Sequence, residues 1–309
     1  MDLVRGLHEL PLPDGPTVVS IGFFDGVHLG HRAVLTRAVE EARVRGVRAI
    51  AVSFDRHPRE ILTPGREPRL LTTVERKAEL IAAIGIDMLL VLEFTEEVSR
   101  WPAEDFVDRV LSDGLRTEHA VVGVDFTFGA KALGTADTLI EVGPSYGFTA
   151  ERVELVHLHG RRVSSSSIRE ALAAGDLAWP ERALGRRYVL DGTVVRGAGR
   201  GTGLGWPTAN LRTFPRLLLP GSGVYAGRAR VPGGERVAAI NVGTNPTFWV
   251  EPLHVESYLL DFDGDLLGQP MAVEFWVRLR DELRFDSPQE LSAAIADDVR
   301  RTRDLVPPS

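Results

Sequence analysis

Two histidines three residues apart are the side chains best placed to do chemistry in this chain. His28 and His31 close the run Gly-Phe-Phe-Asp-Gly-Val-His-Leu-Gly-His at residues 22–31, which directly follows an apolar stretch at 17–21. The pattern predicts a strand, a glycine-bracketed turn and the start of a helix, where residues three apart share a face. A helix start offers backbone N–H groups and a positive dipole end, both of which suit phosphate. The imidazoles could stabilise charge on a phosphate under attack; the alternative is a turn whose histidines only cap or pack.

A run of alternating glycines suggests a second phosphate site. Residues 197–205 read Gly-Ala-Gly-Arg-Gly-Thr-Gly-Leu-Gly, and residues 206–211 read Trp-Pro-Thr-Ala-Asn-Leu. The spacing does not match the Gly-x-Gly-x-x-Gly dinucleotide fingerprint, but glycine lets backbone N–H groups close on phosphates. Thr208 and Asn210 point to one side of an extended segment, and their oxygens are hard ligands that suit Mg²⁺. The alternative is a flexible glycine hairpin.

The strand expected at residues 254–260 carries a candidate general base. Alternation places His254, Glu256 and Tyr258 on one face of this strand and the residues between them on the other. Glu256 could accept the proton of a substrate hydroxyl. A lone glutamate on a strand more often faces solvent, and that alternative stays open.

Two further segments carry polar groups that could bind a ligand. Residues 163–169 read Val-Ser-Ser-Ser-Ser-Ile-Arg, and serines at a helix start with Arg169 one turn on would form a phosphate clamp. A plain helix cap with a surface arginine is equally consistent with this pattern. In residues 122–129, Phe126 and Phe128 could pack on a flat ring and Asp125 could bind a polar group. The alternative for that segment is core aromatics with an Asx turn.

Composition narrows the class of protein. The chain has 309 residues, 44% of them hydrophobic, no cysteine and a net charge of −7. The length predicts about two domains, and the missing cysteine excludes disulfides and cysteine nucleophiles. We expect no zinc, because the histidine pair would need a third protein ligand. The negative charge argues against partners such as nucleic acid or a membrane surface. Without a signal-peptide core or a spanning apolar run, a cytoplasmic protein is expected.

Lysine is almost absent from the chain. Of 36 basic residues only Lys77 and Lys131 are lysines. No Gly-Lys-Ser or Gly-Lys-Thr sequence occurs, so there is no P-loop. Any nucleotide phosphate must therefore be held by backbone N–H groups, arginine, histidine or a metal ion.

Strand and helix signals alternate through the first part of the chain. Strands are expected at 17–21, 48–54, 87–92, 119–124 and 151–156, with helices between them at 31–45, 74–84, 102–111 and 135–142. Short Val/Ile/Leu runs separated by helices predict an α/β doubly wound parallel sheet covered on both faces. Ligands bind such sheets beyond the carboxyl ends of the strands, so the segments at 22–31, 54–59 and 123–129 could converge on one crevice.

The pattern changes near residue 185. Helices are expected at 166–174 and 176–184, and then come short β-branched and aromatic runs punctuated by glycine and proline, at 188–195, 223–230, 237–242, 254–260 and 271–279. Their spacing predicts an antiparallel barrel or sandwich. A closing amphipathic helix from Ser287 would place Leu291, Ile295 and Val299 on one face. We expect two domains, residues 1–185 and 186–309.

Taken together, these segments resemble the bifunctional riboflavin kinase/FAD synthetase family of prokaryotes. The resemblance covers essentially the whole chain, in that family's domain order. Residues 22–31 are similar to its nucleotidylyltransferase signature, and residues 197–211 are similarly specific. The resemblance implies an antiparallel β-barrel kinase that moves the ATP γ-phosphoryl group to riboflavin, giving FMN. It also implies a sheet domain that joins AMP from a second ATP to FMN, giving FAD and pyrophosphate.

The resemblance also implies roles for individual residues. In the kinase, Glu256 would be the base, Thr208 and Asn210 would hold Mg²⁺, and ATP would meet Gly197, Gly199, Gly201 and Gly203. In the adenylyltransferase, ATP would meet Gly22, Phe24, Asp25, Gly26, His28, His31, Ser164, Ser165 and Arg169. FMN would meet Arg66, Asp125 and Phe128.

The chain departs from the family pattern in places, and two other functions compete with this interpretation. Thr127 replaces a common arginine between the two phenylalanines near the FMN site, and Leu267 replaces a frequent tyrosine. One alternative is a flavin-binding protein that has lost its activities. The other is an adenylyltransferase for a pantetheine or nicotinamide compound, against which the kinase-like second half argues.

Overall fold

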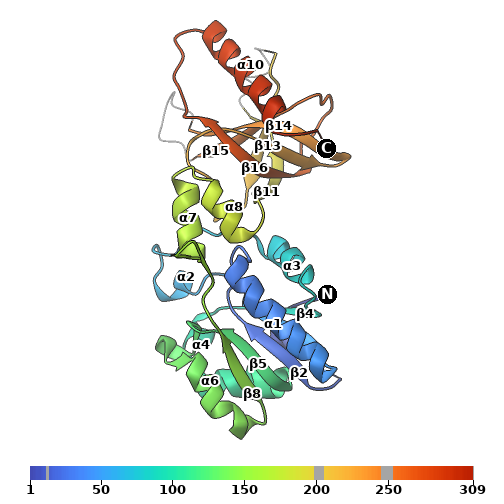
Figure 1. The fold of residues 1–309 in the computed structure, drawn as a ribbon, viewed down its shortest axis with the longest axis vertical. Helices are drawn as coiled ribbons and strands as arrows, with labels where there is room; N and C mark the ends of the chain where they lie inside the picture. The colour runs from blue at the N-terminus through green and yellow to red at the C-terminus, as the bar shows by residue number, and fades with distance from the viewer. Residues whose placement is uncertain (12–13, 198–204, 245–252, 309) are drawn as a thin grey trace. The chain divides into compact units, whose positions relative to one another are not determined.

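The computed structural model describes residues 1–11, 14–197, 205–244 and 253–308. The chain divides into two compact units, Met1–Ser165 and Ser166–Ser309. Figure 1 colours the chain from blue at the N-terminus to red at the C-terminus. Of the glycines expected at the kinase nucleotide, Gly199, Gly201 and Gly203 lie outside the described residues.

The first unit contains a parallel sheet, as the alternating pattern predicts. Its six strands are β1 (Asp2–Arg5), β4 (Met88–Leu92), β3 (Arg48–Phe54), β2 (Thr17–Ile21), β5 (Thr117–Gly123) and β8 (Thr149–Val153), in that spatial order. Every neighbouring pair is parallel. The doubly wound α/β fold is confirmed, and the five expected strands are found with ends shifted by a few residues. The short edge strand β1 was not predicted.

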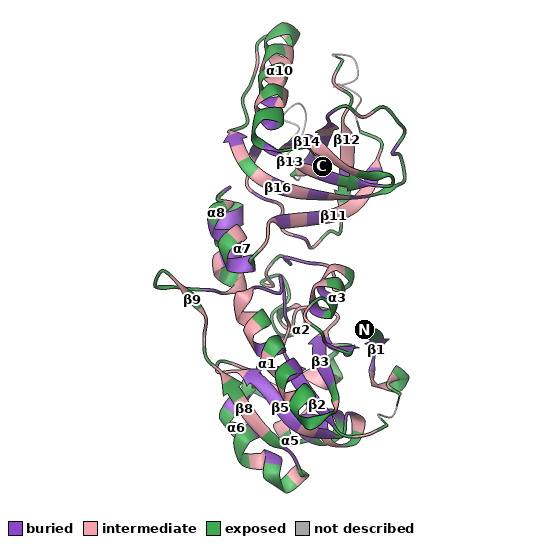
Figure 2. Cartoon of the chain, turned by 45° about the vertical axis from the view of Figure 1, so that its right-hand side comes forward, coloured by how far each residue is buried: buried purple, intermediate pink, exposed green. Residues whose placement is uncertain are grey.

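Helices cover both faces of this sheet because every central strand is apolar on both sides. On one face, Val18 and Ala51 belong to a cluster with α1 (Leu29–Arg45) and α3 (Val74–Ala82). On the other, Val19 and Val52 pack in a cluster with α5 (Ala103–Phe106), its π-helical continuation η2 (Val107–Gly114) and α6 (Ala136–Val142). Figure 2 shows the central strands largely buried and the helices exposed along their outer faces. Burial on two faces explains the near-continuous apolar runs.

The order of the strands places the candidate site. From β2 the chain continues through β3 and β4 on one side, whereas β5 and β8 lie on the other side of β2. The carboxyl ends of β2 and β5 therefore flank the point where the winding direction reverses, which is where open parallel sheets bind ligands. The turn from Gly22 follows β2 and the segment from Val124 follows β5.

The second unit is a barrel preceded by two helices. These are α7 (Ser165–Ala173), which starts at the last residue of the first unit, and α8 (Ala178–Leu184). The closed antiparallel barrel has the strand order β11 (Tyr188–Val195), β12 (Ala209–Thr213), β15 (His254–Leu259), β14 (Gly234–Gly243), β13 (Gly223–Val231) and β16 (Pro270–Arg280). This decides between the barrel and the sandwich that the sequence left open.

The closing helix α10 (Pro288–Leu305) begins where the sequence predicts, with the Ser287 hydroxyl accepting from the Glu290 N–H. Leu291, Ile295 and Val299 are half-buried. The most buried side chains of α10 are polar, and Asp298 accepts two-pronged hydrogen bonds from Arg280 of β16 at 2.7–3.1 Å. An ion pair therefore links α10 to the barrel in addition to the half-buried apolar face that the sequence predicts.

Short elements complete the described chain: η1 (Leu7–Glu9), α2 (Arg59–Leu62), α4 (Glu96–Ser99), β6 (Thr127–Phe128), η3 (Ala130–Ala132), β7 (Gly134–Thr135), η4 (Gly143–Tyr146), β9 (His157–Leu158) and β10 (Arg161–Arg162). Among the helices of the described residues, none has the length and apolar character needed to cross a bilayer.

Candidate active sites

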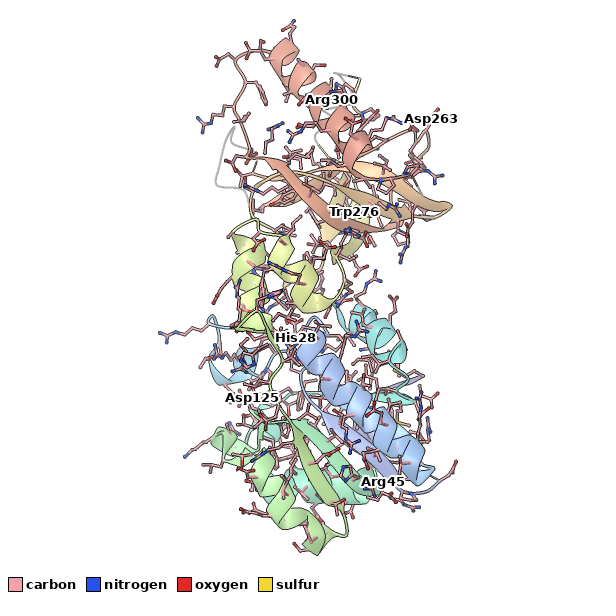
Figure 3. The ribbon with its side chains drawn as sticks, in the orientation of Figure 1. His28, Arg45, Asp125, Asp263, Trp276 and Arg300 are labelled. Carbon is pink, nitrogen blue, oxygen red and sulfur yellow. The ribbon has the colours of Figure 1, made fainter. Side chains whose placement is uncertain are left out.

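The histidine pair lies at the start of α1, where Figure 3 labels His28. His28 is the N-cap, and its Nδ1 accepts a hydrogen bond of 3.2 Å from the His31 backbone N–H. The two rings stack, with centroids 3.6 Å apart and an interplanar angle of 17°. The expected shared face is confirmed. Because an accepting ring nitrogen carries no proton, the neutral His28 ring has its proton on Nε2 and is a donor there.

The turn before the helix is shaped by its own side chains. Phe24 and Val27 adopt left-handed backbone angles, with φ of 52° and 39°. The Phe24 ring is buried in the core on the α1 side of the sheet. A Cβ at Gly22 would come within 2.8 Å of that ring. The buried Asp25 carboxylate accepts from the backbone N–H groups of Leu71 and Thr72, with the shortest distance 2.9 Å.

Several groups of this turn already have partners inside the protein. The aromatic ring of Phe24 and the carboxylate of Asp25 are engaged inside the protein, and Gly26 donates its N–H to the Thr72 hydroxyl at 3.2 Å. These contacts fix the shape of the turn, which sets where the imidazoles and the main chain lie.

Residues 163–165 lie close to the turn at 22–30, within the first unit. The Ser165 hydroxyl donates to the Asp25 carbonyl at 2.9 Å. A Cβ at Gly30 would lie 3.1 Å from the His28 ring and 3.8 Å from the Val163 carbonyl, so the two segments run close together. Ser164 directly precedes α7, and Arg169 lies one turn along that helix. The structure thus brings Ser165 to the turn that follows β2, as a common phosphate site would require.

The three residues expected to contact FMN lie in different environments. Asp125 pairs with Arg162 of β10. Phe128 is buried and its ring stacks on Phe126 at 5.5 Å, so it is a core aromatic of the described unit. Arg66 is exposed in the loop after α2. Arg162 was missed from the sequence, where the only signal was an arginine pair shortly before the serine run.

The kinase candidates lie side by side on the barrel. Asn210 on β12 pairs in register with Glu256 on β15, and the Thr208 hydroxyl lies 3.4 Å from Glu256 Oε2. On the other side of Glu256, Asn241 of β14 is its register partner. Directly paired residues point to the same face. Asn210, Glu256 and Asn241 therefore form a polar row across three strands, of which Asn241 was missed because nothing in its apolar strand marks it.

The alternation expected for β15 is confirmed. Val255, Ser257 and Leu259 are buried, whereas His254 and Glu256 are partly exposed, with His254 Nε2 3.4 Å from Glu256 Oε1. Glu256 is therefore placed on the outward polar face, where a substrate could reach it.

Gly197, the last described residue before a gap, packs directly on Asn210. A Cβ there would lie 2.2 Å from Asn210 Nδ2. A side chain at this position could be accepted only if the Asn210 amide moved away. The start of the glycine run is thus fixed beside one of the two expected metal ligands.

The donors on this face fit magnesium. They are a hydroxyl, an amide and one carboxylate, and the described residues contain no group of three or more His, Cys, Asp or Glu that could hold a metal by itself. Mg²⁺ is commonly held by one or two protein oxygens together with water and substrate phosphates.

The two halves of the chain match two enzyme families. Residues 11–167 match the FAD synthetase family and residues 184–306 match the riboflavin kinase family. A bifunctional riboflavin kinase/FMN adenylyltransferase of Pseudomonas fluorescens is 41% identical, covering 100% of this chain and 99% of its own. The protein of that name from Escherichia coli K12 is 36% identical, covering 99% and 98%, and that of Listeria monocytogenes is 35% identical, covering 93% and 91%.

A solved structure has the same fold throughout. A Streptococcus pneumoniae protein described as a macrolide-efflux protein has a TM-score of 0.88 and 27% identity, covering 99% of this chain and 100% of its own. Its description differs from the names of the sequence relatives, and the likeness bears on the fold. The family matches and the curated relatives agree with each other and with the order of the two sites. The chain belongs to the bifunctional riboflavin kinase/FMN adenylyltransferase family.

Proposed function

We propose that this chain makes FAD from riboflavin in two steps, one in each unit. The barrel phosphorylates riboflavin with ATP, and the sheet unit then adenylylates FMN with a second ATP. The family membership supports both activities and both flavin substrates. The observation that carries the assignment to sites is that each unit contains one cluster of suitable side chains. In the sheet unit, two imidazoles stack at the start of α1. In the barrel, Asn210 lies opposite Glu256.

In the barrel, Glu256 acts as the base for the ribityl 5′-hydroxyl. The carboxylate accepts the hydroxyl proton as that oxygen bonds to the γ-phosphorus of ATP and the bond to ADP breaks. Thr208 and Asn210 lie close enough to Glu256 for their oxygens to hold Mg²⁺ on the same phosphates. The metal, when bound, neutralises charge on the transferring group. Gly197 lies beside Asn210, so its main chain is placed to approach the nucleotide.

In the sheet unit, a phosphate oxygen of FMN attacks the α-phosphorus of ATP. The new P–O bond forms as the bond to pyrophosphate breaks, and no base is needed because the attacking oxygen is already deprotonated. His28 and His31 donate to the phosphates, where donors at the developing charge lower the barrier. Ser164, Ser165 and Arg169 assist in binding ATP. Gly22, Phe24, Asp25 and Gly26 give the turn its shape.

The flavin contacts follow the family resemblance, refined by the structure. Asp125 and Arg66 lie on exposed segments and are placed to meet FMN, whereas Phe128 supports the site through its stack on Phe126. We place the boundary between the two catalytic modules at residues 185/186, and the protein in the cytoplasm. No nucleic-acid or membrane partner is proposed.

Product analysis tests the two-step function. Full-length protein incubated with riboflavin, ATP and MgCl₂ should form FMN and then FAD, separated by reversed-phase chromatography, with pyrophosphate released in step with FAD. Omitting riboflavin and supplying FMN should give FAD alone. FMN without FAD would remove the adenylyltransferase assignment, and neither product would favour a flavin-binding protein.

A further inference from the structure

One of the two lysines in this arginine-rich chain is buried next to Phe23, in the turn that precedes the histidine pair. Lys77 lies on α3 with 2% of its surface exposed. Lysine is among the residues that are almost never fully buried without a partner. The proposed function gives Lys77 no role, so its burial needs another explanation.

Lys77 contacts Phe23 of this turn in two ways, directly at the ring and through Ser53 at the main chain. Its Nζ lies 4.2 Å from the centroid of the Phe23 ring. It also donates to the Ser53 hydroxyl at 3.0 Å, and that hydroxyl donates to the Phe23 carbonyl at 3.0 Å. The ammonium thus reaches both the ring and, through Ser53, the main chain of Phe23, which directly precedes the left-handed Phe24.

Burial of this charge is costly for the fold. Desolvation lowers the pKa of Lys77 to about 8, against the raising effect of the carboxylates of Asp25 and Asp55. Replacing a whole buried ion pair by apolar side chains is often neutral or stabilising, whereas removing one partner of a buried pair is strongly destabilising. The charge is kept at this cost in direct contact with the Phe23 ring and the Ser53 hydroxyl, which links it to the turn.

We propose that Lys77 is a positioning residue of the adenylyltransferase, which holds Phe23 through Ser53 so that the turn at 22–27 keeps the shape that receives ATP. The inference rests on the ATP site proposed above. Lys77 acts on the nucleotide only through the turn, and a small displacement of a turn at a reacting centre is enough to reduce rate strongly.

The test is Lys77→Met in the full-length chain, with Lys131→Met as the matched control because Lys131 is the exposed lysine. For Lys77→Met, we expect kcat/KM for ATP in FMN adenylylation to fall by roughly 10- to 100-fold. Riboflavin phosphorylation on the same molecule should stay within about twofold. The thermal midpoint of the sheet unit should fall, because Asp25 and Asp55 lose the charge that faces them, so both activities are compared at a temperature where the variant is folded. Lys131→Met should leave both activities unchanged.

A pH profile separates positioning from a purely structural role. The wild-type chain should lose adenylylation as pH rises through about 8, where the Lys77 ammonium gives up its proton beside Asp25 and Asp55. Lys77→Met should lack this alkaline limb. A limb that persists in the variant would overturn the inference.

Ser53→Ala tests the route to the main chain and serves if Lys77→Met does not fold. It should lower adenylylation in the same direction, and the double variant should lose less than the two single losses combined. Normal adenylylation in folded Lys77→Met or in Ser53→Ala would overturn the inference. If the wild-type chain makes no FAD from FMN, the proposed function itself fails, which is a distinct outcome.

Discussion

At the scale of single residues, His28 combines two roles that use different ring nitrogens. Its Nδ1 accepts from the His31 N–H and caps α1, which leaves Nε2 as the donor. A capping side chain is fixed in orientation, so the donor needs little reorganisation when charge develops. The cap and the phosphate contact, which the sequence presented as alternatives, are therefore compatible in one side chain.

The His28→Ser variant separates these two roles. Serine is a good N-cap, so the thermal midpoint should stay near that of the wild type, while loss of the Nε2 donor should reduce kcat for FAD formation by about 100-fold. Chromatographic assay of FAD from FMN measures the loss. The exposed His8→Ala is the control. Wild-type FAD formation by His28→Ser would remove the imidazole from the mechanism.

Glu256→Gln tests the barrel base while keeping the size of the side chain. The amide cannot accept the hydroxyl proton as a carboxylate does, so riboflavin phosphorylation should fall by roughly 10²- to 10⁴-fold. FAD formation from added FMN should continue at the wild-type rate. Glu235→Gln, on the same barrel but paired with Arg230, is the control. Equal loss of both reactions in folded Glu256→Gln would contradict separate sites.

At the scale of elements, strands and helices with apolar, periodic sequences can be predicted, whereas short or polar elements are missed. Strands β2 and β3 are found because their runs are buried on both faces. The edge strand β1 has a single buried residue, and β12 follows the glycine run with one buried position, so neither carries a period to detect. The neighbours of Asn210 depend on barrel register, which no local pattern encodes.

The same limit applies to the site residues. The shared face of His28 and His31 follows from helical spacing alone. The inward carboxylate of Asp25 could not be predicted, because its partners at Leu71 and Thr72 are far away in sequence. The burial of Lys77 could not be predicted for the same reason, because its contacts with Phe23 and Ser53 depend on how the strands pair.

Gly197→Ala tests the contact between the glycine run and β12. The new Cβ would lie 2.2 Å from Asn210 Nδ2, so the amide must shift. Because Asn210 is proposed to hold Mg²⁺, KM for MgATP in riboflavin phosphorylation should rise by about tenfold, with FAD formation unaffected. Gly15→Ala, where nothing lies within 4 Å, is the control. An unchanged KM would remove this glycine from the nucleotide site.

At the scale of the whole molecule, helices α7 and α8 belong with the barrel by their contacts. The Gly221 N–H donates to the Leu172 carbonyl at 2.8 Å, and Glu181 of α8 lies 3.4 Å from Arg187. That arginine stacks on Trp276 of the barrel at 3.5 Å. The family matches end at residue 167 and resume at 184, which leaves these helices between them. The structural unit that contains the barrel, Ser166–Ser309, is therefore larger than the catalytic module proposed at residues 186–309.

Two fragments test this difference. Residues 186–309 contain every proposed kinase residue but lack α7 and α8, whereas residues 166–309 keep both helices and their contacts with Gly221 and Arg187. Both fragments should phosphorylate riboflavin, but the shorter one should unfold at a lower temperature, because it loses the buried faces of the two helices, including Trp179. Heating each fragment and assaying residual FMN formation measures the difference. Equal inactivation temperatures would mean that the helices add nothing to the barrel, and the boundary at 185/186 would then be structural as well as catalytic.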